Sequence, residues 1–141
     1  MDIDRSAPVV VELETTVPAA PDTVWRLHTD IDAWPDWNPG IDEARLRGGL
    51  AVGATFDWRT SGLTIASTIG DLDPGSRIVW GGPAHGIDGV HVWTFEPAEG
   101  GTLVRTRESW AGEPVDADPQ GMRAALEGSL AAWLDALRAA V

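Results

Sequence analysis

Two residues in the second half of the chain, His91 and Glu108, have side chains that could move protons. Each lies in a stretch of alternating apolar and polar residues that predicts a β-strand, and a short turn segment, 97–101, separates the two stretches. If Phe95 and Val104 both point inward across this turn, counting back in antiparallel register places His91 opposite Glu108 on one face. A slip of one residue would separate them, so the prediction depends on the loop length.

An imidazole buried beside a carboxylate is a pair that can do chemistry. The carboxylate selects the tautomer of the imidazole and raises its basicity, so the pair could remove a proton next to a carbonyl group and protonate a leaving hydroxyl. Two other interpretations of His91 and Glu108 stay open. They are a polar anchor for a bound ligand and a buried pair that only satisfies its own hydrogen bonds.

The other two histidines are expected to have lesser roles. His28 comes near the C-terminal end of an expected helix, where a surface or capping position is favoured by the helix dipole. His85 lies in a glycine-rich segment, either as part of a mobile cavity mouth or as a plain solvated loop residue. The three histidines are too scattered for a metal motif and the chain has no cysteine, so we expect no metal site. Nucleophile, phosphate-loop and dinucleotide motifs are missing too, and we expect no cofactor.

Periodicity and turn signals predict the elements that would position these residues. A half-buried strand comes first, then two short helices interrupted by prolines, six more strands, and a long helix with Asp118 as N-cap and Pro119 as first residue. Residues 82–88 are expected to form a glycine-rich loop and residues 111–118 an irregular segment. The expected strands cover residues 9–17, 41–47, 54–60, 63–72, 77–81, 89–96 and 102–110, and the long helix runs from 119 to about 140.

This order favours an α+β fold in which a curled, seven-stranded antiparallel sheet has the long C-terminal helix over its concave face. Alternation along the strands predicts which side chains face an internal cavity between sheet and helix. The chain has eight tryptophans and no tyrosine, and these rings either fill a closed core or line that cavity. Trp37 is expected to close one end. The other predicted ligand-binding residues are Phe56, Trp58, Ile65, Ser67, Ile69, Trp80, Trp93, Phe95 and Thr106 from the strands, and Met122, Leu126, Leu130 and Trp133 from the helix.

Length and charge restrict the class of protein further. With 141 residues, we expect one domain that spans residues 1–141. The net charge of −12 makes nucleic acid a poor partner, because phosphate binding needs clustered positive charge. No apolar run approaches the roughly 20 residues of a membrane span and no leader is recognisable, so we expect a cytoplasmic protein without membrane insertion.

Short motifs along almost the whole chain carry a resemblance to a known family. They are Val24-Trp25, the segment 34–41, the segment 52–56, the Asp73-Pro74-Gly75 turn with Ile78 and Trp80, the segment 89–95, and Gly100-Gly101-Thr102 with Val104 and Glu108. In this order they resemble the START-like (SRPBCC, helix-grip) superfamily, and within it the bacterial polyketide cyclase/dehydrase-type proteins. The resemblance implies a helix-grip fold with a cavity between the concave sheet and the long helix.

Three functions remain open at this point. The first is binding of a small apolar or aromatic metabolite, polyketide-like or lipid-like, in the cavity. The second is a cofactor-free polyketide cyclase, aromatase or dehydratase that uses His91 and Glu108 as an acid/base pair. The third is a protein-interaction domain similar to co-chaperones of this fold, which would need an exposed apolar patch on the convex face. The sequence names neither the ligand nor the oligomeric state.

Overall fold

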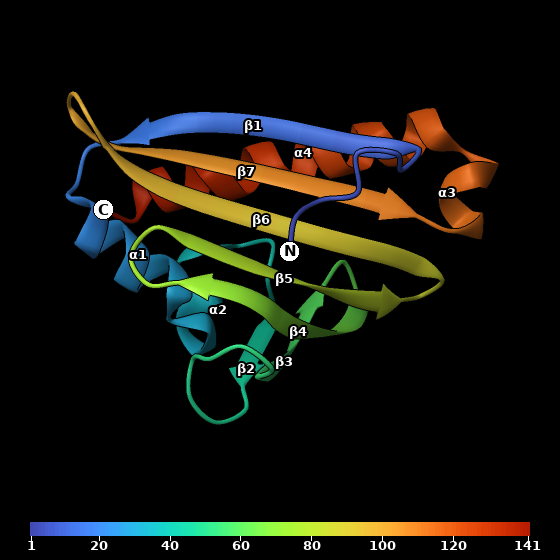
Figure 1. The fold of residues 1–141 in the computed structure, drawn as a ribbon, viewed down its shortest axis with the longest axis horizontal. Helices are drawn as coiled ribbons and strands as arrows, with labels where there is room; N and C mark the ends of the chain where they lie inside the picture. The colour runs from blue at the N-terminus through green and yellow to red at the C-terminus, as the bar shows by residue number, and fades with distance from the viewer.

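A computed structural model describes residues 1–141, and its central feature is one antiparallel sheet of seven strands in the order β1-β7-β6-β5-β4-β3-β2 (Figure 1). Strands that follow one another in the sequence pair as hairpins from β2 to β7, and β1 joins the sheet beside β7. The structure confirms the predicted α+β fold. The strands are β1 (Val9–Val17), β2 (Glu43–Leu46), β3 (Thr55–Thr60), β4 (Leu63–Asp73), β5 (Arg77–Ala84), β6 (Ile87–Ala98) and β7 (Gly101–Ala111).

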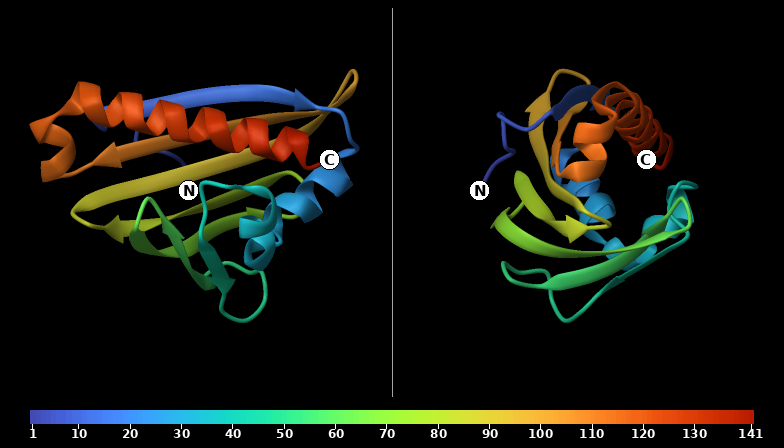
Figure 2. Two further views of the ribbon diagram at one scale, coloured as in Figure 1. Left: turned by 180° about the vertical axis from the view of Figure 1, so that it is seen from behind. Right: turned by 90° about the vertical axis from the view of Figure 1, so that its right-hand side faces the viewer.

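The long helix α4 (Pro119–Ala139) runs along the inner side of the curled sheet, beside β1 and β7 (Figures 1 and 2). The side chain of Asp118 accepts a hydrogen bond from the backbone N–H of Gly121, and Pro119 fits the first turn, where no donor is needed. No helix in the structure combines the length and the apolar character that crossing a membrane requires. The helix buries an apolar stripe against the sheet, formed by Leu126, Leu130, Trp133, Leu134 and Leu137.

A second group of helices fills one end of the curl. Helix α1 (Pro21–Thr29), a 3-10 turn (Ile31–Ala33) and helix α2 (Trp34–Trp37) connect β1 to β2. Trp34 is fully buried, and its indole N–H donates to the backbone carbonyl of His28 at 2.7 Å, which ties α2 to the end of α1. These helices therefore occupy concave space that a simple sheet-and-helix grip would leave open.

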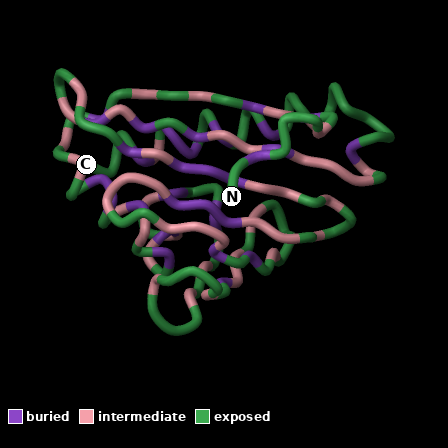
Figure 3. The backbone as a smooth tube through the Cα atoms, viewed as in Figure 1, coloured by how far each residue is buried: buried purple, intermediate pink, exposed green.

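The largest cluster of buried side chains, with 16 residues, lies between the concave face and the helices. Figure 3 marks along the backbone which residues are buried. Trp80 and Trp93 contribute to it from the sheet, and Trp133 from α4. A smaller cluster holds the other end of α4 against β1. It consists of Val9, Val11, Val115, Leu126 and Leu130.

Two segments differ from the sequence predictions. Residues 82–88 are mostly strand rather than loop, because β5 and β6 continue until only His85 and Gly86 remain as a two-residue turn. Both turn residues have positive φ, 53° and 81°, the combination that tight hairpins favour. Residues 113–117 form a short helix, α3 (Glu113–Ala117), instead of an irregular segment. Gly112, with φ of 128°, makes the reversal that starts it.

Candidate functional site

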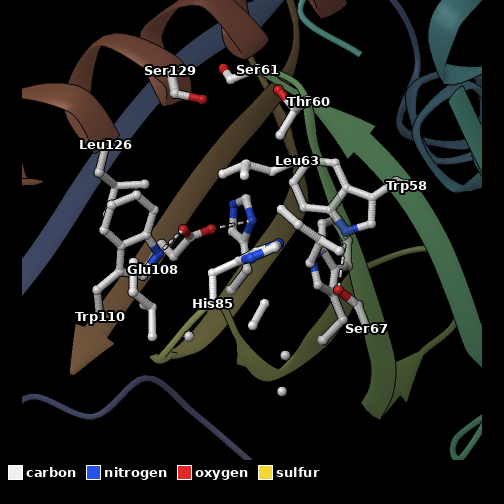
Figure 4. A pocket seen from close by; sticks show the side chains of 18 of the residues that line it. Trp58, Thr60, Ser61, Leu63, Ser67, His85, Glu108, Trp110, Leu126 and Ser129 are labelled. Atoms are coloured by element: carbon white, nitrogen blue, oxygen red, sulfur yellow. Dashed lines mark hydrogen bonds and ion pairs between the residues drawn. The ribbon is translucent and has the colours of Figure 1, made fainter. Parts of the chain in front are cut away.

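His91 on β6 and Glu108 on β7 are paired directly across the two strands. Nδ1 of His91 lies 2.6 Å from Oε1 of Glu108 (Figure 4). Phe95 pairs with Val104 in the same ladder, as the loop length predicts, so the expected register is confirmed. The His91 side chain is 3% exposed and that of Glu108 is 13% exposed, which places the pair in a largely dry environment.

Both ring nitrogens of His91 are engaged by protein groups. Its Nε2 lies 2.7 Å from the hydroxyl oxygen of Thr106, which is also buried. A neutral imidazole satisfies this arrangement if it donates from Nδ1 to Glu108 and accepts the Thr106 hydroxyl proton at Nε2. The indole N–H of Trp110 donates to the other carboxylate oxygen of Glu108 at 2.5 Å. Glu108 is thus held by two donors and keeps lone pairs for a third.

A cavity of about 260 Å³ lies between the concave face and α4, and His91 and Glu108 form part of its wall. The wall is mainly apolar and contains no lysine or arginine. In Figure 4, Trp58 and Trp110 stand on opposite sides of the space, with Glu108 and His85 between them. Half of the chain's tryptophans line this cavity: Trp58, Trp80, Trp110 and Trp133.

The predicted ligand-binding residues divide into two groups. Those on the cavity wall are Trp58, Ile65, Ser67, Trp80, Leu126, Leu130 and Trp133. Phe56, Ile69, Trp93 and Phe95 instead lie in the main core cluster, and Trp37 packs against it. Thr106 is buried under His91, and Met122 packs against the smaller cluster. The residues of the core cluster do not reach the cavity because α1 and α2 fill the concave end beside them. Alternation predicts that a side chain points inward, but not whether it meets empty space.

His28 differs most from the sequence expectation. It takes no surface or capping position, because its imidazole is fully buried among aromatic rings. The ring centroids of Trp93, Phe95 and Trp80 lie 4.4, 5.2 and 5.7 Å away. Neither of its ring nitrogens has a hydrogen-bonding partner in the protein. Burial, and to a lesser extent the nearby His91, lower the pKa of His28 well below its usual value of 6.5, so the ring is neutral.

The sequence does contain a signal for this burial. Val24, Trp25 and His28 are the buried residues of α1, and their spacings of three and four place them on one face of the helix. A helix dipole at the C-terminal end favours a charged histidine there. The apolar face prevails because the aromatic core surrounds the ring on the side away from solvent.

Two hairpin turns border the mouth of the cavity. Ser61 in the β3–β4 turn and His85 in the β5–β6 turn line it, and both have positive φ. The Nε2 of His85 lies 2.9 Å from the carbonyl oxygen of Thr64, which links the two hairpins. Ser129 on α4 also lines the cavity and is exposed (Figure 4).

Trp110 is a wall residue that the sequence predictions do not include. It shares the strand face of Thr106 and Glu108, two and four residues before it, so alternation alone could have identified it. Its indole fixes the carboxylate orientation, which makes it part of the polar side of the cavity.

Many solved structures share this fold. An aromatase/cyclase named Zhui, from a Streptomyces species, matches with a TM-score of 0.79 and 19% identity, over 92% of this chain and 91% of that chain. A START superfamily protein from Mycobacterium smegmatis matches with a TM-score of 0.78 and 18% identity, over 94% of this chain and 96% of that chain. A hypothetical protein from Helicobacter pylori matches with a TM-score of 0.77 and 20% identity, over 93% of this chain and 85% of that chain. At these identities the likeness shows the fold.

Sequence comparison gives the family. No curated protein matches the chain. The family model described as "Polyketide cyclase / dehydrase and lipid transport" matches residues 8–141, nearly the whole chain, from the start of β1 to the end of α4. Membership in this family supports a role in ligand binding or cyclisation. The match shows that the chain belongs to the polyketide cyclase/dehydrase and lipid transport family.

Proposed function

We propose that this chain binds one small, largely apolar or aromatic molecule, polyketide-like or lipid-like, in the cavity between the sheet and α4. The observation that carries the proposal is the cavity itself, about 260 Å³ with a mainly apolar wall and four indole rings. An apolar protein cavity of about 150 Å³ holds benzene, so this one has room for roughly two fused rings. It lies just below the roughly 300 Å³ at which pockets for drug-sized ligands begin.

Filling the cavity tests this proposal. Ile65 lines the cavity, whereas the next residue, Ala66, is exposed on the other side of β4. We expect naphthalene and 1-naphthalenemethanol to bind the native protein with one site and a Kd on the order of 100 µM or below. Ile65→Trp should weaken this binding at least about tenfold, because the new indole takes the ligand's place.

The matched control is Ala66→Trp, which adds the same side chain outside the cavity and should keep the native affinity. Isothermal titration calorimetry gives the affinities, and thermal unfolding shows that both variants are folded. No saturable binding of either probe to the native protein, or unchanged binding in Ile65→Trp, would contradict the proposal.

A second candidate function, cyclisation or dehydration of a poly-carbonyl substrate, has support from the 2.6 Å contact between His91 and Glu108 on the cavity wall. Because both His91 nitrogens are occupied within the protein, Glu108 is the member of the pair with capacity left to touch a substrate. In that case Glu108 moves the proton and His91 positions it. Turnover of a poly-carbonyl substrate that disappears in Glu108→Gln, while substrate binding remains, would favour this function over binding alone.

The third interpretation, a protein-interaction domain, has no comparable support. It needs a contiguous apolar patch on the outer face of the sheet. The exposed large apolar side chains come from four separate segments, and one of them, Leu63, borders the cavity instead. They are Met1, Val52, Leu63 and Val141.

A further inference from the structure

The charge of the cavity wall restricts what it can hold. Glu108 is the one acidic residue among the lining residues, and no lysine or arginine accompanies it. His91 can serve both Glu108 and Thr106 as a neutral imidazole, and in that form it leaves the carboxylate charge without a cationic partner in the wall. A carboxylate in a largely dry site gains most from a positive charge brought close to it.

The aromatic rings around Glu108 favour the same sign of charge. The faces of indole rings carry negative potential and attract cations, tryptophan more strongly than the other aromatic residues. Trp110 contacts Glu108 directly, and Trp80 lies next to His91, with ring centroids 4.9 Å apart. Trp58 faces Trp110 from the other side of the cavity (Figure 4). Trp110 turns its N–H edge towards Glu108. A cation in the space between Glu108 and Trp58 therefore has the carboxylate on one side and an indole ring on the other (Figure 4).

The hydrogen-bonding groups of the wall also favour a cationic ligand. The indole N–H groups of Trp58 and Trp110 are both used within the protein, on Ser67 and Glu108. The free lone pairs of Glu108 call for a donor on the ligand, which an ammonium group supplies. The net charge of −12 adds a long-range field that attracts cations and repels anions.

We propose that the ligand of this cavity is an organic cation: a protonated amine attached to an aromatic body of one or two rings. The ammonium group lies against Glu108, and the aromatic body lies among Trp58, Trp80 and Trp133. This inference rests on the proposed function, because it assigns a chemical class to the molecule that the cavity binds.

Three probes with the same ring system and different charge test the inference at pH 7 on the unmodified protein. They are 1-naphthylmethylamine, which is cationic, 1-naphthalenemethanol, which is neutral, and 1-naphthoic acid, which is anionic. We expect the amine to bind at least about tenfold more tightly than the alcohol, and the acid to bind more weakly than both. In two-dimensional ¹⁵N–¹H spectra, the amine should shift the indole N–H signal of Trp110 more than the alcohol does, because that group shares Glu108 with the ligand.

Glu108→Gln removes the charge, and the ratio of alcohol Kd to amine Kd should then fall to about one. The matched control is Glu14→Gln, which changes the net charge equally on an exposed residue ion-paired with Arg105, away from the cavity. That control should keep the ratio. An equal loss in both variants would assign the preference to the overall field of the protein and overturn the site. The three-probe ranking needs no variant, so it decides the question even if Glu108→Gln does not fold.

The outcomes separate this inference from the function on which it rests. If the alcohol binds as tightly as the amine or more tightly, the cation site is wrong while the cavity still binds ligands. If none of the three probes binds, the proposed function fails together with the cation site. Amine preference that disappears in Glu108→Gln alone supports both.

Discussion

The imidazoles of His28 and His91 contact the same indole: the ring centroid of Trp93 lies 4.4 Å from that of His28 and 5.2 Å from that of His91. Both histidines are buried, but their hydrogen bonding is opposite. His91 has a partner at each ring nitrogen, on Glu108 and Thr106, whereas His28 has none. An unsatisfied buried polar group costs about 1–3 kcal/mol, so one substitution should affect the two sites with opposite sign.

His28→Phe should stabilise the protein. Phenylalanine keeps an aromatic ring among Trp93, Phe95 and Trp80 and removes two nitrogens that have no partner. We expect the free energy of unfolding to rise by about 1–3 kcal/mol in urea denaturation at pH 8. A lower free energy of unfolding, with an unchanged denaturant slope, would contradict this reading of the core.

His91→Phe is the matched comparison and should destabilise the protein. It leaves the Glu108 carboxylate without its 2.6 Å partner and the buried Thr106 hydroxyl without an acceptor. The loss should be about 3 kcal/mol or more, since a buried charge is among the groups left behind. An unchanged free energy of unfolding in the same experiment would mean that the contacts of His91 with Glu108 and Thr106 contribute little to stability.

Stability should fall on acidification because of His28. Its pKa is far below 6.5 in the folded protein and near 6.5 in the unfolded chain, so the unfolded chain binds more protons as the pH drops. The contribution of the neutral ring is therefore complete above pH 6.5 and decreases below it, towards the folded pKa. Between pH 7.5 and 5.5 the native protein should lose about 1.4 kcal/mol relative to His28→Phe. A constant difference between the two proteins across this range would contradict the assignment.

Thr106→Val tests the hydrogen bond between the Thr106 hydroxyl and His91. Valine has nearly the same shape but cannot donate to Nε2 of His91, which lies 2.7 Å from the hydroxyl oxygen. We expect a loss of about 1–3 kcal/mol in the free energy of unfolding. Thr68→Val, at an exposed position of β4, should change it by less than about 0.5 kcal/mol. Equal effects at the two positions would show that the hydroxyl of Thr106 does not matter.

Gly112→Ala should disturb the region where β7 leads into α3, beside the mouth of the cavity. The added Cβ would lie 2.1 Å from the carbonyl oxygen of Gly86, and φ at this position is 128°. A loss of more than about 1 kcal/mol is expected. Gly128→Ala in α4 meets no atom within 4 Å and should instead stabilise by about 0.5–1 kcal/mol. Thermal unfolding of the two variants compares them directly, and shifts of the same sign would contradict the argument.

The sequence predicts the pairing of His91 with Glu108 because strand alternation and a short turn leave few registers possible. It does not predict the extent of the cavity, since the empty volume depends on how deeply α1 and α2 enter the curl. Phe56 and Trp58 illustrate the difference: both face inward on β3, yet the first is packed in the core and the second borders the cavity. For His28, the buried face of α1 decides the outcome over the dipole at its C-terminal end.

Trp80 and Trp133 belong both to the main core cluster and to the wall of the cavity. Replacing either ring to suit a new ligand would also remove part of the support for α4, so selection cannot adjust the inner wall without a loss in folding. Ala125 and Ser129 line the rim of the cavity and are exposed, so replacing them does not remove core packing. Divergence among relatives, and directed evolution of this chain, should therefore change ligand preference first through residues at the rim. Substitutions of Trp80 and Trp133 should come later and together with compensating changes elsewhere.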